Sequence, residues 1–145
     1  MSDDGRGFDH VVIIGPGRMG LALGAALRQV EAVDRLIYYG RGYEAPPHPI
    51  FDPHPLPGDV DAASAGAEYR MWPSQIPSDT SIVILAVPDR ALTEVAHDLA
   101  VGGPAPPGCV ALHLSGALST DALAPLHAAG YTVGSMHPLM AVADP

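Results

Sequence analysis

One stretch decides the fold of this chain: residues 11–20, Val11-Val12-Ile13-Ile14-Gly15-Pro16-Gly17-Arg18-Met19-Gly20. It begins with consecutive β-branched residues, which are typical of a strand buried on both faces in a parallel sheet. The glycines that follow have the spacing G-x-G-x-x-G. Gly15 permits a tight turn, Gly17 lets a phosphate group approach the backbone, and Gly20 lets a helix pack closely on the sheet. The stretch therefore predicts a strand, a phosphate-binding turn and a helix.

The residues after the turn supply the structural context that this motif needs. Apolar residues recur at helical spacing, and residues 36–39, Leu36-Ile37-Tyr38-Tyr39, then form a second apolar run that stops at Gly40. A strand, a helix and a strand in this order make a βαβ unit, in which the helix N-terminus binds the pyrophosphate of a dinucleotide. The alternative is a glycine-rich turn that binds nothing. The candidate cofactor-binding residues are Gly15, Pro16, Gly17, Arg18, Met19 and Gly20.

The rest of the chain continues the alternation of strands and helices. Apolar runs predict strands at residues 69–72, 81–87, 110–113 and 131–133. Helices are expected between the later strands, one capped by Asp89 and one over residues 119–128 that Pro125 disturbs. Six prolines between residues 42 and 66 exclude a helix through most of that stretch, which we interpret as a long surface loop. The pattern predicts one α/β domain with a doubly wound, mostly parallel Rossmann-type sheet and helices on both faces.

Composition narrows the range of functions. The 145 residues suit one domain, and sixteen acidic against seven basic residues give a formal charge of −9, which disfavours nucleic acid as a partner. All seven basic residues are arginine, which excludes lysine-based catalysis. No apolar run is long enough for a membrane span and residues 1–10 have no signal-peptide core, so we expect a cytoplasmic protein. We expect a buried, structural role for the single cysteine, Cys109, and no metal site.

The end of the second predicted strand bears on the identity of the cofactor. NAD-binding units usually place a carboxylate there to accept hydrogen bonds from the adenosine ribose, whereas this chain has Gly40 and Arg41. A small residue followed by arginine leaves room for a 2′-phosphate and supplies a bidentate donor to it, which favours NADP over NAD. The alternative for Arg41 is a solvated loop charge, and for Arg18 the two interpretations, holding phosphate or pointing to water, are equally weighted. The missing carboxylate also disfavours S-adenosylmethionine and a methyltransferase-like function.

Further candidates follow the later predicted strands. Ligands of open α/β sheets bind at the carboxyl ends of the strands, which is where Ser115, Gly116 and His137 fall. Val87 and Pro88 at the same edge are expected to line the nicotinamide ribose. Asp89 belongs to this edge too, although its position suits a helix cap better.

Together these motifs resemble a known group, the Rossmann-like proteins that carry a helical C-terminal domain of unknown function. They are relatives of pyrroline-5-carboxylate reductase and prephenate dehydrogenase in the 6-phosphogluconate dehydrogenase-like superfamily. The resemblance covers nearly the whole chain and rests on residues 12–20, 39–41, 85–89, 113–119 and 134–139. It implies NADP binding, an oxidoreductase and a homodimer. From the pattern of the chain we expect an N-terminal tail over residues 1–10 and a domain over residues 11–141. The resemblance implies, at residues 142–145, the start of a linker to a helical domain that this chain lacks.

The same resemblance assigns candidate catalytic residues. His137-Pro138-Leu139 is similar to the His-Pro-hydrophobic segment of prephenate dehydrogenases, in which the residues matching Ser115 and His137 orient and polarise a substrate hydroxyl. Met140-Ala141 departs from that family, and a structural role for His137 stays open. The sequence thus predicts the NADP-binding domain of an oxidoreductase that transfers hydride to or from an unassigned small substrate. The alternative is a module that binds or senses NADP without turning it over.

Overall fold

The structure is a computed structural model that describes residues 8–29, 33–52 and 66–136. Its centre is a six-stranded sheet in which all neighbouring strands are parallel, in the order β3-β2-β1-β4-β5-β6. This order is that of the doubly wound dinucleotide-binding fold, so the predicted fold class is confirmed. The strands are β1 (Phe8–Ile14), β2 (Val33–Gly40), β3 (Glu68–Met71), β4 (Ile82–Leu85), β5 (Val110–His113) and β6 (Thr132–Ser135).

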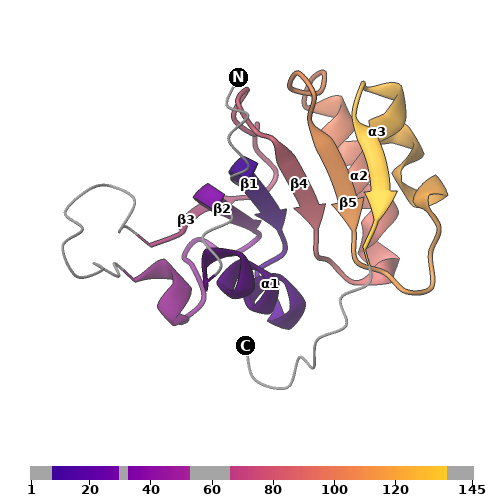
Figure 1. Ribbon diagram of the computed structural model, residues 1–145. Helices are drawn as coiled ribbons and strands as arrows, with labels where there is room; N and C mark the ends of the chain where they lie inside the picture. Colours follow the sequence, from indigo (N-terminus) through magenta and orange to yellow (C-terminus); the bar gives the residue numbers. More distant parts are fainter. Residues whose placement is uncertain (1–7, 30–32, 53–65, 137–145) are drawn as a thin grey trace.

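Helices cover both faces of the sheet (Figure 1). The helices are α1 (Arg18–Gln29), α2 (Asp89–Val101) and α3 (Ala124–Ala128), together with the 3₁₀ helices η1 (Pro49–Phe51) and η3 (Thr120–Leu123). Side chains of β1 alternate between two apolar clusters, because successive residues of a strand point to opposite faces. Val11 and Ile13 pack with residues of α1 and η1, whereas Val12 and Ile14 pack with residues of α2 and α3.

A buried tyrosine fixes α1 to the sheet. The hydroxyl of Tyr38 in β2 donates a hydrogen bond of 2.7 Å to the carbonyl oxygen of Gly20 in the first turn of α1. Burial raises the pKa of Tyr38 well above its ordinary value, which keeps the hydroxyl protonated as a donor. One turn further along α1, a Cβ atom at Gly24 would collide with the Tyr38 hydroxyl. Gly24 therefore marks a contact between helix and strand that the helical periodicity does not reveal.

Two element ends differ from the sequence-based expectation. β1 begins at Phe8, so residues 8–10 belong to the sheet and not to a tail. α2 begins at Asp89 itself, and its N-cap is Pro88, which makes no side-chain cap hydrogen bond, so the prediction of Asp89 as the cap was wrong. Proline has no side-chain acceptor to offer a free N–H group, but its fixed φ suits a residue that leads into a helix. Asp89 stabilises the helix from its first turn through the helix dipole instead.

The proline-rich stretch is not a surface loop throughout its described part. Residues 49–51 form η1, in which Ile50 is buried in the cluster under α1. Proline is tolerated in the first turn of a helix, and the ring of His48 accepts a hydrogen bond from the Ile50 N–H group to cap that turn. The disturbance expected at Pro125 is confirmed, because the segment divides into η3 and α3, with the proline in the first turn of α3.

Candidate functional site

The glycines of the turn have different physical roles. Gly15 has a φ of +109°, and a Cβ atom there would collide with the carbonyl of Ala86 at the end of β4. At Gly20 a Cβ atom would collide with the carbonyl oxygen of Gly15. These two glycines are required by the folding of the turn itself. A Cβ atom at Gly17, in contrast, meets nothing within 4 Å, so the absence of a side chain there leaves open space in front of the turn.

The N-terminus of α1 is suited to an anion. Gly17 and Arg18 are exposed where the helix begins, and the first turn contains no acidic residue. The free N–H groups and the positive end of the helix dipole are therefore not compensated by a carboxylate from within that turn. The first turn of α2 contains Asp89 and differs in this respect. Of the two longer helices, α1 is the better anion site.

A cleft of about 330 Å³ lies beside the glycine turn. It brings together the ends of β1, β2 and β4 with the first turns of α2, and Trp72 after β3 completes it. Of the candidate residues, Gly15, Pro16, Gly40, Arg41, Val87 and Pro88 line this cleft. Gly17, Arg18, Met19 and Gly20 belong to the adjoining turn and do not line it, and neither do Ser115 and Gly116.

The position of Gly40 requires a glycine for a reason that its sequence neighbours do not indicate. A Cβ atom at Gly40 would stand 2.7 Å from the hydroxyl of Tyr69 and 3.0 Å from the ring of Pro16. Tyr69 in turn donates a hydrogen bond of 2.8 Å to the carbonyl oxygen of Gly42. The glycine therefore lets the turn and the end of β2 approach each other, which shapes the cleft wall in front of Arg41.

The cleft contains two residues that the sequence analysis did not select, Trp72 and Arg90. Arg90 is the second residue of α2, and its side chain had no motif to mark it. No Asp or Glu lines the cleft, whereas Arg41 and Arg90 both line it. The described cleft is thus positively charged in a chain whose formal charge is −9.

The loop after β5 is organised by a histidine that sequence reasoning also missed. His113 is fully buried, its Nδ1 atom accepts a hydrogen bond of 3.1 Å from the Ser115 N–H group, and its Nε2 atom lies 2.9 Å from the carbonyl oxygen of Ser119. These partners assign the proton to Nε2 in a neutral ring. A histidine at the end of a buried strand, followed by Leu-Ser-Gly, is the signal that could have identified it.

Ser115 makes local hydrogen bonds in this loop. Its hydroxyl oxygen accepts from the N–H groups of Ala117 at 3.1 Å and Leu118 at 3.0 Å. The side chain is half-buried, and the neighbouring Gly116 is exposed. The hydroxyl therefore has its proton left to donate, while its lone pairs stabilise the turn. His137, its predicted partner, lies outside the described residues.

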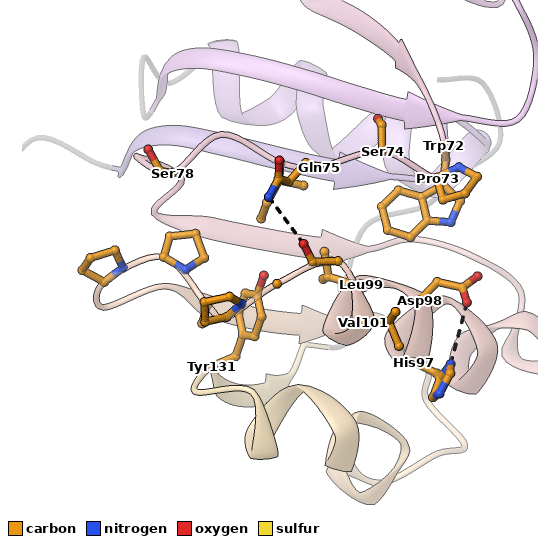
Figure 2. A pocket seen from close by; sticks show the side chains of 17 residues that line it. Trp72, Pro73, Ser74, Gln75, Ser78, His97, Asp98, Leu99, Val101 and Tyr131 are labelled. Atoms are coloured by element: carbon orange, nitrogen blue, oxygen red, sulfur yellow. Dashed lines mark hydrogen bonds and ion pairs between the residues drawn. The ribbon is translucent and has the colours of Figure 1, made fainter.

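A second, larger groove of about 840 Å³ lies between the β3–β4 connection and the end of α2. Figure 2 shows Trp72 and Gln75 on one side, with His97, Val101 and Tyr131 on the other. Trp72 lines both this groove and the cleft, and its buried indole N–H group has no hydrogen-bond partner among the described residues. An unpaired buried donor is costly, which makes Trp72 an unusual element of the wall between the two cavities.

Other site types find little support in the described part of the chain. No group of three or more His, Cys, Asp or Glu side chains there is arranged to hold a metal ion. None of its helices has the length and apolar character needed to cross a membrane. Cys109 is buried, and burial raises the pKa of its thiol to about 11. A thiol in that state is a poor nucleophile at neutral pH, in keeping with a structural residue.

The parallel sheet, the strand order and the glycine turn define the class of this protein as an α/β domain with a nucleotide-binding fold. A family model described as Rossmann-like domain matches residues 66–138. The chain belongs to this Rossmann-like domain family. None of the curated proteins matches its sequence.

Solved structures of NAD(P)-dependent oxidoreductases have a similar fold. A prephenate dehydrogenase from A. aeolicus, in complex with hydroxyphenyl propionate and NAD+, superimposes with a TM-score of 0.59 at 18% identity over 94% of this chain and 43% of its own. A Plasmodium falciparum pyrroline carboxylate reductase with NADP bound gives 0.62 at 15% identity over 92% of this chain and 44% of its own. A diketoreductase gives 0.66 at 18% identity, covering 94% and 51%. The chain thus spans about half the length of these proteins or less.

Proposed function

We propose that this chain is the NADP-binding domain of an oxidoreductase that transfers hydride between NADP(H) and a small substrate. The observation that carries the proposal is the open glycine turn at the N-terminus of α1, beside a cleft that contains arginine and no carboxylate. NADPH supplies a hydride to an electrophilic carbon when it is bound. The chain's own residues would bind and orient it.

The described residues fit a dinucleotide. The space in front of Gly17 admits the pyrophosphate, which the free N–H groups at the start of α1 would hold. Pro16, Gly40 and Arg41 would contact the adenosine ribose from the cleft wall. Val87 and Pro88, at the end of β4, lie on the side of the turn that leads toward β5 and would line the nicotinamide ribose.

The preference for NADP over NAD rests on the end of β2. Arg41 is exposed and lines the cleft, and Gly40 lets the backbone approach the turn. A guanidinium group binds a phosphate monoester through two parallel hydrogen bonds, whereas the ribose hydroxyls of NAD are better served by a carboxylate. The lining of the cleft therefore supports a cofactor with an additional phosphate.

The chemistry would take place at the carboxyl end of β5. We propose Ser115 and His137 as the pair that contacts the substrate, with the serine hydroxyl donating its free proton and the histidine moving a proton near neutral pH. His113 would be a positioning residue, because it holds the Ser115 backbone through Nδ1. The substrate itself is not identified by these groups.

The proposal extends to the complete protein. This chain covers only about half or less of each of the three structural relatives. Their greater length supports the helical C-terminal domain and the homodimer that the resemblance implies. Such a domain would exclude water from the nicotinamide during hydride transfer. We further propose that the protein is cytoplasmic and binds neither nucleic acid nor membranes, in keeping with its formal charge of −9.

A second function is favoured by one observation. The lone pairs of the Ser115 hydroxyl are used by two backbone N–H groups, as in a loop that serves structure alone. In that case the domain would bind or sense NADP without turning it over. The two functions share the cofactor site and differ only at the carboxyl end of β5.

Calorimetric titration of the chain with NADPH and NADH tests the proposal. We expect both to bind, and NADPH to bind more tightly. Equal affinities would contradict the assignment to NADP. If neither cofactor binds, the proposed function itself is contradicted. Turnover of imines, keto acids and hydroxy acids by the complete protein then distinguishes the enzyme from the sensing module.

A further inference from the structure

The cleft concentrates positive charge from two separate elements. Arg41 follows the last residue of β2, and Arg90 is the second residue of α2, and both line the same space of about 330 Å³. The chain has only seven basic residues against sixteen acidic ones, so two of the seven meet in one small cleft. Two like charges repel each other in such a space unless an anion lies between them.

The two arginines also differ from others in the chain by their lack of partners. Arg35 donates to both oxygens of Glu68, at 2.6 and 3.1 Å, and Arg70 contacts the same carboxylate at 3.3 Å. In the described part of the chain, neither the Arg41 nor the Arg90 side chain has a hydrogen bond or an ion pair. Their guanidinium groups keep all their donors for another molecule.

Within the described residues no carboxylate forms an ion pair with Arg90. The adjacent Asp89 is exposed but does not line the cleft, and the other lining residues of α2 are the apolar Ala91 and Val95. A phosphate monoester, with a charge of about −1.5 to −2 at pH 7, can accept from two guanidinium groups at once because it has three terminal oxygens. A ribose hydroxyl cannot balance two positive charges.

We infer that Arg90 is a second phosphate ligand, which together with Arg41 binds the 2′-phosphate of the adenosine ribose. The inference rests on the proposed function and adds to it a specificity residue on α2. Discrimination between NADP and NAD is then shared between β2 and α2. A change at Arg41 alone would reduce it without removing it.

The test compares nucleotide fragments that differ only in this phosphate. 2′,5′-ADP and 5′-AMP are titrated against the chain and the variants Arg90→Ala and Arg90→Lys. Arg28→Ala is a charge-matched control, because Arg28 lies in the last turn of α1, away from the glycine turn. Trp72, the only tryptophan, lies in the cleft wall and provides a fluorescence signal alongside calorimetry. Far-UV circular dichroism of each variant establishes that it is folded.

We expect Arg90→Ala to weaken the binding of 2′,5′-ADP by tenfold or more, which corresponds to the loss of about one charge-assisted hydrogen bond. The binding of 5′-AMP should weaken by less than about threefold. Arg90→Lys should recover part of the loss, since lysine keeps the charge but not the planar fork. Unchanged affinity for 2′,5′-ADP, or equal losses for both fragments, would overturn the inference while leaving the dinucleotide site in place. If the unmodified chain binds neither NADPH nor NADH, the proposed function fails as well.

Discussion

The glycine turn and the loop after β5 lie at the same edge of the sheet but are built differently. In the turn, Gly15 and Gly20 are fixed by close backbone contacts, and Gly17 leaves open space in front of the helix. In the loop, His113 and Ser115 direct their polar atoms to neighbouring backbone groups. The first region has unused donors that face outward, whereas the second uses most of its hydrogen-bonding capacity to hold its own shape.

The difference teaches which half of the proposed chemistry the described residues can support. Cofactor binding needs backbone N–H groups and cations at one strand end, and the turn with its cleft offers both. Proton transfer needs a side chain with a free lone pair near the substrate, and in the loop Ser115 can donate but has its acceptors engaged. Substitutions in the turn should therefore act on cofactor binding, and substitutions in the loop should act on turnover.

Replacing Gly17 by valine should abolish dinucleotide binding and leave the fold intact. The added side chain occupies the space that the pyrophosphate needs and meets no protein atom within 4 Å at its Cβ position. Calorimetry measures the binding and thermal unfolding measures the stability. Gly15→Ala is the matched contrast, because its positive φ and the Ala86 carbonyl should make it destabilising. Wild-type affinity in a folded Gly17→Val variant would place the site elsewhere.

Replacing His137 by asparagine in the complete protein tests the second region. If the enzyme function is correct, turnover should fall by roughly 100-fold or more, the usual scale for a general acid or base. The affinity for NADPH should stay within about threefold, since this histidine is not assigned to the cofactor site. Steady-state kinetics and cofactor titration provide the two measurements. Unchanged turnover would return His137 to a structural role.

Replacing Arg41 by alanine should reduce the preference for NADPH over NADH by roughly 1 to 3 kcal/mol, because a charge-assisted contact to the 2′-phosphate is lost. The affinity for NADH should change little. Parallel titrations with both cofactors give the difference directly, and Arg28→Ala again serves as the charge-matched control. A similar loss for both cofactors would mean that Arg41 acts on the common part of the dinucleotide.

The contact behind the turn should affect stability and not chemistry. Gly24→Ala places a methyl group against the Tyr38 hydroxyl and should lower the free energy of unfolding by roughly 1 to 3 kcal/mol. Tyr38→Phe should cost about 1 kcal/mol through the hydrogen bond to Gly20. The double variant should lose less free energy of unfolding than the sum of the two single losses, because removing the hydroxyl makes room for the methyl group. Urea unfolding measures all three, and strict additivity would contradict the contact.

The smallest effect is expected where β2 and β3 meet. The guanidinium of Arg35 holds the pKa of the Glu68 carboxyl below its ordinary value of 4.5. A carboxyl whose pKa is lowered on folding contributes stability above its unfolded pKa and loses it as pH falls through the folded pKa. Glu68 is about 42% exposed, so the contribution should be only about 0.5 kcal/mol. Glu68→Gln should therefore be less stable at pH 7 and no different at pH 3 by urea unfolding.

The sequence predicted the sheet well because its strands carry strong signals. β1, β4 and β5 each contain a short apolar run, which is typical of a strand that is buried on both faces in a parallel sheet. The glycine spacing located the turn for the same reason, since only glycine fits at Gly15 and Gly20. Expectations failed where several local solutions exist, as at the start of α2, where both Pro88 and Asp89 suit a helix N-terminus.

The candidate site was only partly accessible to sequence reasoning. Gly40 and Arg41 lie at a recognisable strand end, but Arg90 enters the cleft only because the fold brings the first turns of α2 beside the ends of β1 and β2, which no local pattern encodes. His113 was overlooked because its function is to bind backbone atoms up to six residues ahead. Trp72 lies between two cavities whose walls come from widely separated segments. Such placements depend on tertiary packing and have no signature in spacing or composition.

The hydrogen bond from Tyr38 to the carbonyl oxygen of Gly20 also bears on how a ligand arrives. It ties the first helical turn to a strand that is itself buried, so the glycine turn is ordered before anything binds. A partner that meets an ordered turn loses less conformational entropy on association. Its on-rate is then limited by encounter and orientation, typically about 10⁵ to 10⁷ M⁻¹s⁻¹, and not by a slow rearrangement of the site. Tyr38, which is buried away from any ligand, would thus help to set the rate of ligand association.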